Sequence, residues 1–221
     1  VAADLGRPTA RSTGFGTDFL DYDNDGWLDL FVTNGAVNII ESQRGEPVPY
    51  KMPNQLFRNL GNGRFAEVSA QAGDAFRRPE VGRAAAFGDI DNDGGVDILI
   101  ANRDETPTLL RNVVPSRGHW LLVSVRDRRG SDALGAQLLV RSGDRVIRRD
   151  VRSAYSYLAA NDPRVHVGLG AVIRVDHIDV RWTDGTTERF GPRDVHRTIP
   201  MRRATGTTVG KPQAPAPTEP P

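Results

Sequence analysis

The chain has 221 residues, with 23 glycines, 15 prolines and no cysteine, so disulfides, thiolate metal sites and cysteine nucleophiles are excluded. No apolar run approaches the roughly 20 residues that a membrane-spanning helix needs, and no signal segment follows Val1, so we expect a processed or truncated chain. The net charge of +1 conceals an asymmetry: 17 acidic and 11 basic residues up to Val114 are followed by 10 acidic and 17 basic residues from Pro115 to Arg203, which predicts a domain boundary near Pro115.

A long internal repeat dominates the first half of the chain. Residues 19–35 read FLDYDNDGWLDLFVTNG and residues 87–103 read FGDIDNDGGVDILIANR, at an offset of 68 residues. A related stretch follows each copy, NQLFRNLGNGRF at 54–65 and PTLLRNVVPSRGHW at 107–120. Each repeat is therefore predicted to be a strand, an aspartate turn, a strand and a second strand pair. The alternating apolar residues after each turn fall on one face of an extended segment: Leu28, Leu30 and Val32, and Val96, Ile98 and Ile100.

Each aspartate turn has the spacing D-x-D-x-D-G-x-x-D, which predicts a calcium site. Four carboxylates within nine residues repel one another unless a cation lies between them. Gly26 and Gly94 permit the sharp turn, and a backbone carbonyl at the seventh position would complete the ring. Such dense hard oxygens suit Ca²⁺ better than Mg²⁺, which prefers strict octahedral geometry. The predicted ligands are Asp21, Asp23, Asp25, Trp27 and Asp29, and Asp89, Asp91, Asp93, Gly95 and Asp97.

Two other interpretations of these turns fit less well. An EF-hand needs a bidentate Glu at position 12 and a helix on each side, whereas position 12 is Val32 or Ile100 within a β-type run. Aspartates also cap ordinary turns, but two matching four-aspartate loops disfavour that explanation. We therefore expect two structural calcium ions.

The remaining segments are predicted to be strands, turns and loops. Residues 36–53 contain three prolines and are expected to be a surface insertion. Residues 206–221 are rich in proline and are expected to be a disordered tail or linker. Alternating apolar residues from His119 onward predict a β-sandwich-like domain. Its expected strands are His119–Val125, Gln137–Val140, Val146–Val151, Ile178–Trp182 and Thr186–Phe190, with turns at Ser142-Gly143-Asp144 and Asp184-Gly185.

These motifs resemble known families. Both aspartate loops resemble the FG-GAP/VCBS repeats of integrin-type β-propellers, in which such a loop lies between two strands of a blade and binds calcium. Four later stretches resemble the ASPIC/UnbV domain: GHWLLVSV, ALGAQLLVRSG, SYLAANDPRVHVGLG and VDHIDVRWTDGTTERF. The ordered combination resembles the C-terminal part of cartilage-acidic-protein-type secreted proteins, of a bacterial kind. A whole propeller has about seven blades, so we expect N-terminal blades to be missing.

The expected fold class is all-β. Residues 1–114 are predicted to be two FG-GAP/VCBS-like calcium-binding repeats forming a partial propeller, residues 115–205 an ASPIC/UnbV-like β domain, and residues 206–221 the tail. The resemblance implies a calcium-binding, extracytoplasmic interaction or adhesion module that binds a protein or a glycan. Two alternatives are an accessory protein or enzyme of a natural-product pathway of the enediyne type, which the same resemblance raises, and a carbohydrate-binding protein.

Other residue patterns carry less information. The four histidines are widely spaced, without an H-x-x-x-H pair, and predict no zinc site. No nucleophile signature is present, so no enzymatic activity is expected. Arginines cluster at Arg126–Arg129 and Arg148–Arg152, but without a motif or interleaved aromatic residues they favour a solvated or domain-docking face over nucleic-acid binding. Tyr155, Tyr157 and Trp182 would serve a sugar-binding surface, although Trp182 alternates with core residues.

Overall fold

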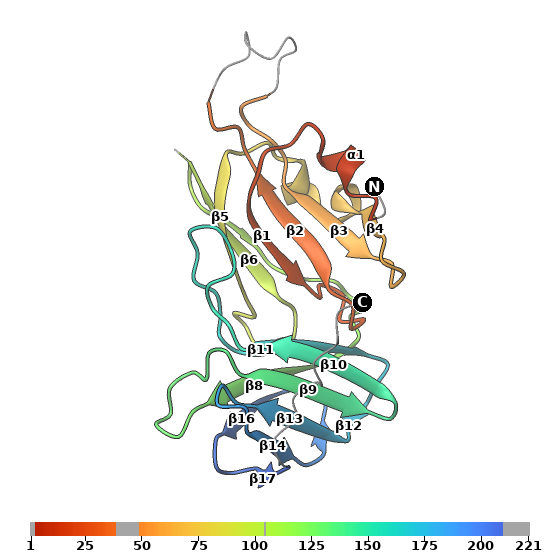
Figure 1. The fold of residues 1–221 in the computed structure, drawn as a ribbon. Helices are drawn as coiled ribbons and strands as arrows, with labels where there is room; N and C mark the ends of the chain where they lie inside the picture. The colour runs from red at the N-terminus through yellow and green to blue at the C-terminus, as the bar shows by residue number, and fades with distance from the viewer. Residues whose placement is uncertain (1–2, 39–48, 104, 210–221) are drawn as a thin grey trace, which may run out of the picture.

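A computed structural model describes residues 3–38, 49–103 and 105–209. This part of the chain is nearly all β, with several sheets and none closed into a barrel. Two stacked blades stand on a β-sandwich, and the ends of β1, β2, β5 and β6 that carry the aspartate loops face the sandwich (Figure 1). The predicted fold class, a partial propeller followed by a sandwich-like domain, is confirmed. None of the helices in the described ranges has the length and hydrophobicity that crossing a membrane requires.

The first blade is a four-stranded antiparallel sheet in the order β1-β2-β3-β4. Its strands are β1 (Gly14–Leu20), β2 (Asp29–Asn34), β3 (Gln55–Asn59) and β4 (Phe65–Glu67), preceded by the short helix α1 (Gly6–Thr9). Residues 39–48 of the predicted insertion lie outside the described residues. Ala36 and Met52, near its ends, are buried, and Met52 forms a β-bridge with Glu80. The described ends of the insertion are therefore tied to the blades.

The second blade is a three-stranded antiparallel sheet in the order β5-β6-β7. Its strands are β5 (Gly82–Gly88), β6 (Asp97–Asn102) and β7 (Thr108–Leu110), reached through the 3-10 helices η2 (Ser69–Gln71) and η3 (Asp74–Arg77). The two blades share one apolar core: Leu20, Phe31, Leu56, Phe76, Ala85, Phe87, Val96, Ile98 and Ile100. The Phe31 ring meets the Phe87 ring edge-on at 5.9 Å. The blades are thus held together by face-to-face packing.

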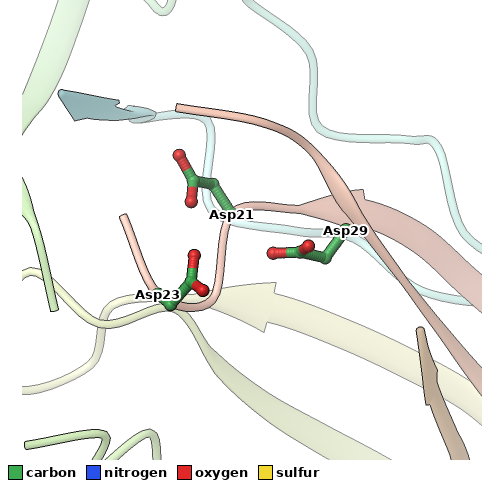
Figure 2. A group of neighbouring side chains, drawn as sticks. All are labelled: Asp21, Asp23 and Asp29. Atoms are coloured by element: carbon green, nitrogen blue, oxygen red, sulfur yellow. The ribbon is translucent and has the colours of Figure 1, made fainter. Parts of the chain in front are cut away.

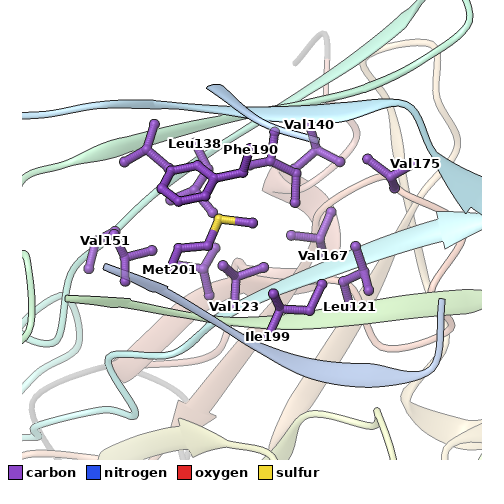
Figure 3. Close-up of a cluster of buried hydrophobic side chains, with 14 of the residues drawn as sticks. Leu121, Val123, Leu138, Val140, Val151, Val167, Val175, Phe190, Ile199 and Met201 are labelled. Atoms are coloured by element: carbon purple, nitrogen blue, oxygen red, sulfur yellow. The ribbon is translucent and has the colours of Figure 1, made fainter. Parts of the chain in front are cut away.

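The sandwich packs a five-stranded sheet, β10-β9-β13-β14-β17, against a three-stranded sheet, β11-β8-β16, beside a small sheet of β12 and β15. The strands are β8 (His119–Arg126), β9 (Gln137–Ser142), β10 (Arg145–Asp150), β11 (Val165–Gly170), β12 (Arg174–Val175), β13 (His177–Arg181), β14 (Thr187–Phe190), β15 (Arg193–Asp194), β16 (Arg197–Arg202) and β17 (Thr207–Thr208). Side chains from both main sheets form one buried core, including Leu121, Leu138, Val167, Phe190 and Met201 (Figure 3).

Most expected strands of this domain occur within one or two residues of their predicted bounds, and the turn at Gly143 and the turn at Gly185 both have positive φ. The first residues of the predicted tail lie against the sandwich. Thr207–Thr208 pair with β14, and the Val209 amide donates to the Thr187 carbonyl, while the disordered tail stays a prediction. Residues 210–221 lie outside the described part of the chain.

Candidate metal centres

Both aspartate loops adopt the same backbone conformation. In the first loop Asn24 has φ 60° and Gly26 has φ 92°, and in the second Asn92 has φ 59° and Gly94 has φ 86°. Glycine adopts this left-handed region without strain and asparagine tolerates it better than most residues. The Asn-Asp-Gly run shared by the repeats therefore creates two tight turns that fold their aspartate side chains inward.

Three carboxylates meet in the first loop. Asp21, Asp23 and Asp29 point toward one another (Figure 2), and each offers an oxygen within 4.8 Å of the others. Backbone amides fix two of them: the Gly26 N–H donates to Asp21 Oδ2 at 2.9 Å, and the Asn59 N–H donates to Asp29 Oδ1 at 2.8 Å. The loop thus holds a preformed oxygen cluster.

The first cluster is deeply buried. Asp21 is 1% exposed and Asp29 is 0% exposed. Burial raises the pKa of Asp21 to about 8, with a further rise from the neighbouring charges of Asp29 and Asp25, against the lowering effect of Arg149. Burial also raises the pKa of Asp29 to about 7. Asp21 Oδ1 is buried and has no hydrogen-bond partner. These raised pKa values mean that the two carboxyls are about half or more protonated at neutral pH, and a bound cation would favour their ionised forms.

The second loop repeats this arrangement. Asp89, Asp91 and Asp97 offer oxygens within 4.8 Å of one another. The Gly94 N–H donates to Asp89 Oδ2 at 2.9 Å, and the Asn112 N–H donates to Asp97 Oδ1 at 2.8 Å. Burial raises the pKa of Asp89. The second oxygen of Asp89 accepts the Asp93 N–H at 3.1 Å. Both oxygens of Asp89 therefore have hydrogen-bond partners, unlike those of Asp21.

The third aspartate of each motif lies outside these clusters. Asp25 accepts the Trp27 N–H at 2.8 Å and lies 3.4 Å from Arg58, while Asp93 accepts the Gly95 N–H at 2.8 Å and lies 3.0 Å from Arg117. Burial would raise the pKa of Asp93, but the Gly95 amide and Arg117 together lower it. The structure therefore brings together three of the four predicted carboxylates in each loop, and the roles of Asp25, Asp93 and the carbonyls of Trp27 and Gly95 stay predictions.

The clusters fit a calcium ion in size and chemistry. Calcium takes six to eight oxygens at about 2.3–2.6 Å, so oxygens on opposite sides of the ion lie up to about 5 Å apart. Separations within 4.8 Å match this spacing. The orphaned Asp21 Oδ1 is the kind of buried oxygen that an ion would satisfy.

Several residues that support the clusters escaped the sequence analysis. Asn59, the last residue of β3, and Asn112, just after β7, donate their backbone amides to Asp29 and Asp97. Each follows an arginine, and Arg58 lies 3.0 Å from Asp23. The Arg-Asn pair occurs at matching positions of the two repeats, which is the signal that could have revealed it.

The histidines do not extend these sites. His119 Nδ1 and His196 Nε2 lie 2.6 Å apart, a contact that no sequence spacing indicates. Burial lowers the pKa of His166 to about 4, and this neutral ring donates to the Gly94 carbonyl. Within the described residues, the two aspartate clusters are the groups of three or more histidines or acidic residues able to share a metal.

Comparisons with known proteins agree with both halves of the fold. The family described as FG-GAP-like repeat matches residues 21–100, and the family described as ASPIC and UnbV matches residues 126–208. The chain is 27% identical over 175 residues to cartilage acidic protein 1 of Homo sapiens and of Mus musculus, and 27% identical over 176 residues to that of Xenopus tropicalis.

These alignments cover 75% of this chain but only 24% of the human protein and 25% of the other two, so the chain spans about a quarter of the length of the relatives it matches. The two matched regions together suggest an extracellular module of the interaction type. The chain therefore carries an FG-GAP-like repeat region followed by an ASPIC and UnbV domain.

Proposed function

We propose that this chain is a calcium-binding interaction module in which each aspartate loop binds one structural calcium ion. The observation that carries the proposal is the buried, unpartnered Asp21 Oδ1 inside a cluster of three converging carboxylates. Calcium would be held by Asp21, Asp23 and Asp29 in the first loop and by Asp89, Asp91 and Asp97 in the second. Its charge would offset the desolvation of these groups and fix both turns.

The remaining ligands come from the same loops. Asp25 and Asp93 join through their carboxylates or through water, and Trp27 and Gly95 through their carbonyls, which brings the oxygen count toward the six to eight that calcium takes. Arg58 now contacts Asp23 and Asp25, and this exposed side chain would give way to the ion.

The setting of the module is extracytoplasmic. Extracellular calcium modules bind with Kd values of about 10⁻⁴–10⁻³ M, which are useful only where calcium is abundant.

We propose a protein or a glycan as its partner. Outside the loops, Asp18 is the one carboxyl of the described residues whose pKa burial raises. Its charged neighbour is Arg152, so it does not pair with a second carboxyl of raised pKa. This environment supports a binding role rather than acid–base catalysis.

Calcium titration by calorimetry tests the proposal. We expect two ions per chain, and one ion per chain for Asp21→Asn and for Asp89→Asn. The matched control, Asp144→Asn, alters an exposed turn carboxylate and should keep both sites. A chain that takes up no calcium would disprove the proposal. Protein and glycan arrays, probed with calcium and with chelator, then identify the partner class.

Carbohydrate recognition has one specific observation in its favour. Tyr157 is 47% exposed and its ring lies 5.5 Å from that of Phe15, so an aromatic surface is available for stacking on a sugar. Tyr155 is half-buried beneath Arg152 and Trp182 is 3% exposed in the sandwich core, so neither is available in the same way. Loss of a glycan-array signal in Tyr157→Ala would favour this role.

A further inference from the structure

The second domain contacts the backbone of the first aspartate loop. The Gly118 N–H donates to the Asp23 carbonyl at 2.8 Å, and the Gly170 N–H donates to the Asn24 carbonyl at 2.7 Å. Two arginines of β10 continue the series: Arg145 donates to the Asp25 carbonyl at 3.1 Å and Arg149 to the Gly26 carbonyl at 3.4 Å. Four successive carbonyls of this loop therefore accept hydrogen bonds from residues beyond Pro115.

The second loop is held in the same way. Arg164 donates to the Asp89 carbonyl at 2.8 Å and to the Asn92 side chain at 2.5 Å. His166 donates to the Gly94 carbonyl at 3.0 Å. The Gly94 carbonyl also accepts from the Asn24 side chain at 3.0 Å, which links one loop to the other. The two loops are thus hydrogen-bonded to each other. Both also bond to residues of β11, and the second loop bonds in addition to Arg164 just before β11.

Strand β11 approaches the first loop closely because it carries Gly168. A Cβ atom at this position would lie 1.9 Å from Asp21 Oδ2 and 2.8 Å from the Asn24 Cα. Asp21 and Asp89 also line a single cavity of about 150 Å³ together with residues of the second domain, among them Arg149 and His166. The second domain therefore forms one wall around both carboxylate clusters.

We propose that the ASPIC and UnbV domain is a positioning element of both calcium sites, so that calcium binding and docking of this domain onto the blades are coupled. The inference rests on the proposed calcium sites. In each loop the carboxylates converge into the cluster, while backbone carbonyls of the same loop accept hydrogen bonds from the second domain. Either partner orders one shared backbone, so each lowers the entropy that the other must overcome. By linkage the coupling is reciprocal.

Amide hydrogen exchange on the full chain tests this coupling. The interdomain amides of Gly118 and Gly170 should exchange at least about tenfold faster in chelator than in calcium, within the usual range of coupling between sites. Amides of β13, in the middle of the five-stranded sheet, serve as the internal control and should not change. Equal protection of Gly118 and Gly170 in both conditions would overturn the coupling.

Calorimetric calcium titration of the same samples separates the two possible failures. If calcium binds while the protection of Gly118 and Gly170 stays the same, the sites exist but are independent of docking. If no calcium binds, the proposed function and this inference fail together. The exchange comparison uses the unaltered chain, so it does not depend on the folding of any variant.

A glycine pair supplies a matched mutational test without a change of charge. Gly168→Ala forces a methyl group into the contact with Asp21 and Asn24, and it should weaken calcium binding about tenfold and deprotect the Gly170 amide. Gly191→Ala adds the same methyl group where no atom lies within 4 Å, and it should leave both properties unchanged. Wild-type calcium affinity in a folded Gly168→Ala protein would contradict the inference.

Discussion

Removal of calcium should lower the thermal stability of this chain by a predictable amount. A site that binds only the folded state contributes RT ln(1 + [Ca²⁺]/Kd). With Kd about 10⁻⁴–10⁻³ M and about 10 mM free calcium, each site contributes roughly 1.4–2.7 kcal/mol, and two sites roughly 3–5 kcal/mol. For a chain of this size, that corresponds to a Tm change of roughly 6–20 °C.

The structure explains why the effect should be large for the first loop. Asp21 and Asp29 are almost fully buried, and burial raises their pKa values to about 8 and about 7. Holding them ionised in the folded state therefore destabilises the calcium-free chain at neutral pH, and a bound divalent cation removes this penalty.

Differential scanning calorimetry in calcium, in chelator and in magnesium measures the change. Asp21→Asn removes the charge but keeps an acceptor for the Gly26 amide, so this variant should be at least as stable as wild type in chelator. Its gain on calcium addition should fall to about half, because the second loop remains. A Tm that is the same in millimolar calcium and in chelator would refute the reasoning, as would a full calcium gain in Asp21→Asn.

Three further changes have defined outcomes. Arg58→Ala removes a cation 3.0 Å from Asp23 and an exposed ion pair worth at most about 1 kcal/mol, so calcium should bind about two- to tenfold tighter in a chelator-competition titration. Phe31→Ala, at 0% exposure, should cost about 3–5 kcal/mol in urea unfolding, against less than about 1 kcal/mol for Phe19→Ala, which is 47% exposed. Burial raises the pKa of Asp18 to about 6 despite Arg152. A carboxyl whose pKa is raised in the folded state makes the protein less stable as pH rises from about 4 through 6. Asp18→Asn should therefore be roughly 1–3 kcal/mol more stable than wild type at pH 7.5 and equally stable at pH 3.5.

The sequence predicts the strands of both domains well, because alternation and turn residues are local signals. It does not predict which face of a blade is buried. Phe31 and Leu99 occupy the same position of the repeat, yet Phe31 is 0% exposed and Leu99 is 49% exposed. Phe31 faces the shared core between the blades, while Ile98 and Ile100 face that core from the other side. The difference arises from the way the two blades stack on each other, and the sequence of a repeat carries no information about that stacking.

The candidate sites show the same division between local and distant information. The converging aspartates lie within one nine-residue motif and were predicted from their spacing. The residues that hold the loops in place come from far along the chain: Asn112 donates its side-chain amide to the Tyr22 carbonyl, and Gly168 contacts Asp21. The Gly168-Leu-Gly170 run carries no recognisable ligand motif. Its contacts with Asp21 and Asn24 follow from the position of β11 against the first loop, which the local sequence does not indicate.

The junction between the halves of the chain combines polar and apolar contacts. The fully buried residues of the blade core end with Ile100 and those of the sandwich core begin with Leu121, so the predicted boundary near Pro115 lies between them, while Tyr155 of the second half packs against the blade core. The backbone carbonyls of both loops accept hydrogen bonds across this boundary. Apolar contacts lie beside them, because the Trp120 ring packs against Gly94 and Tyr155 packs against the core of the blades. The polar contacts exchange with water at small net cost, whereas the apolar contacts favour the docked state with or without an ion. We therefore expect a bound divalent cation to strengthen docking by ordering the loop carbonyls, in addition to what the apolar contacts contribute.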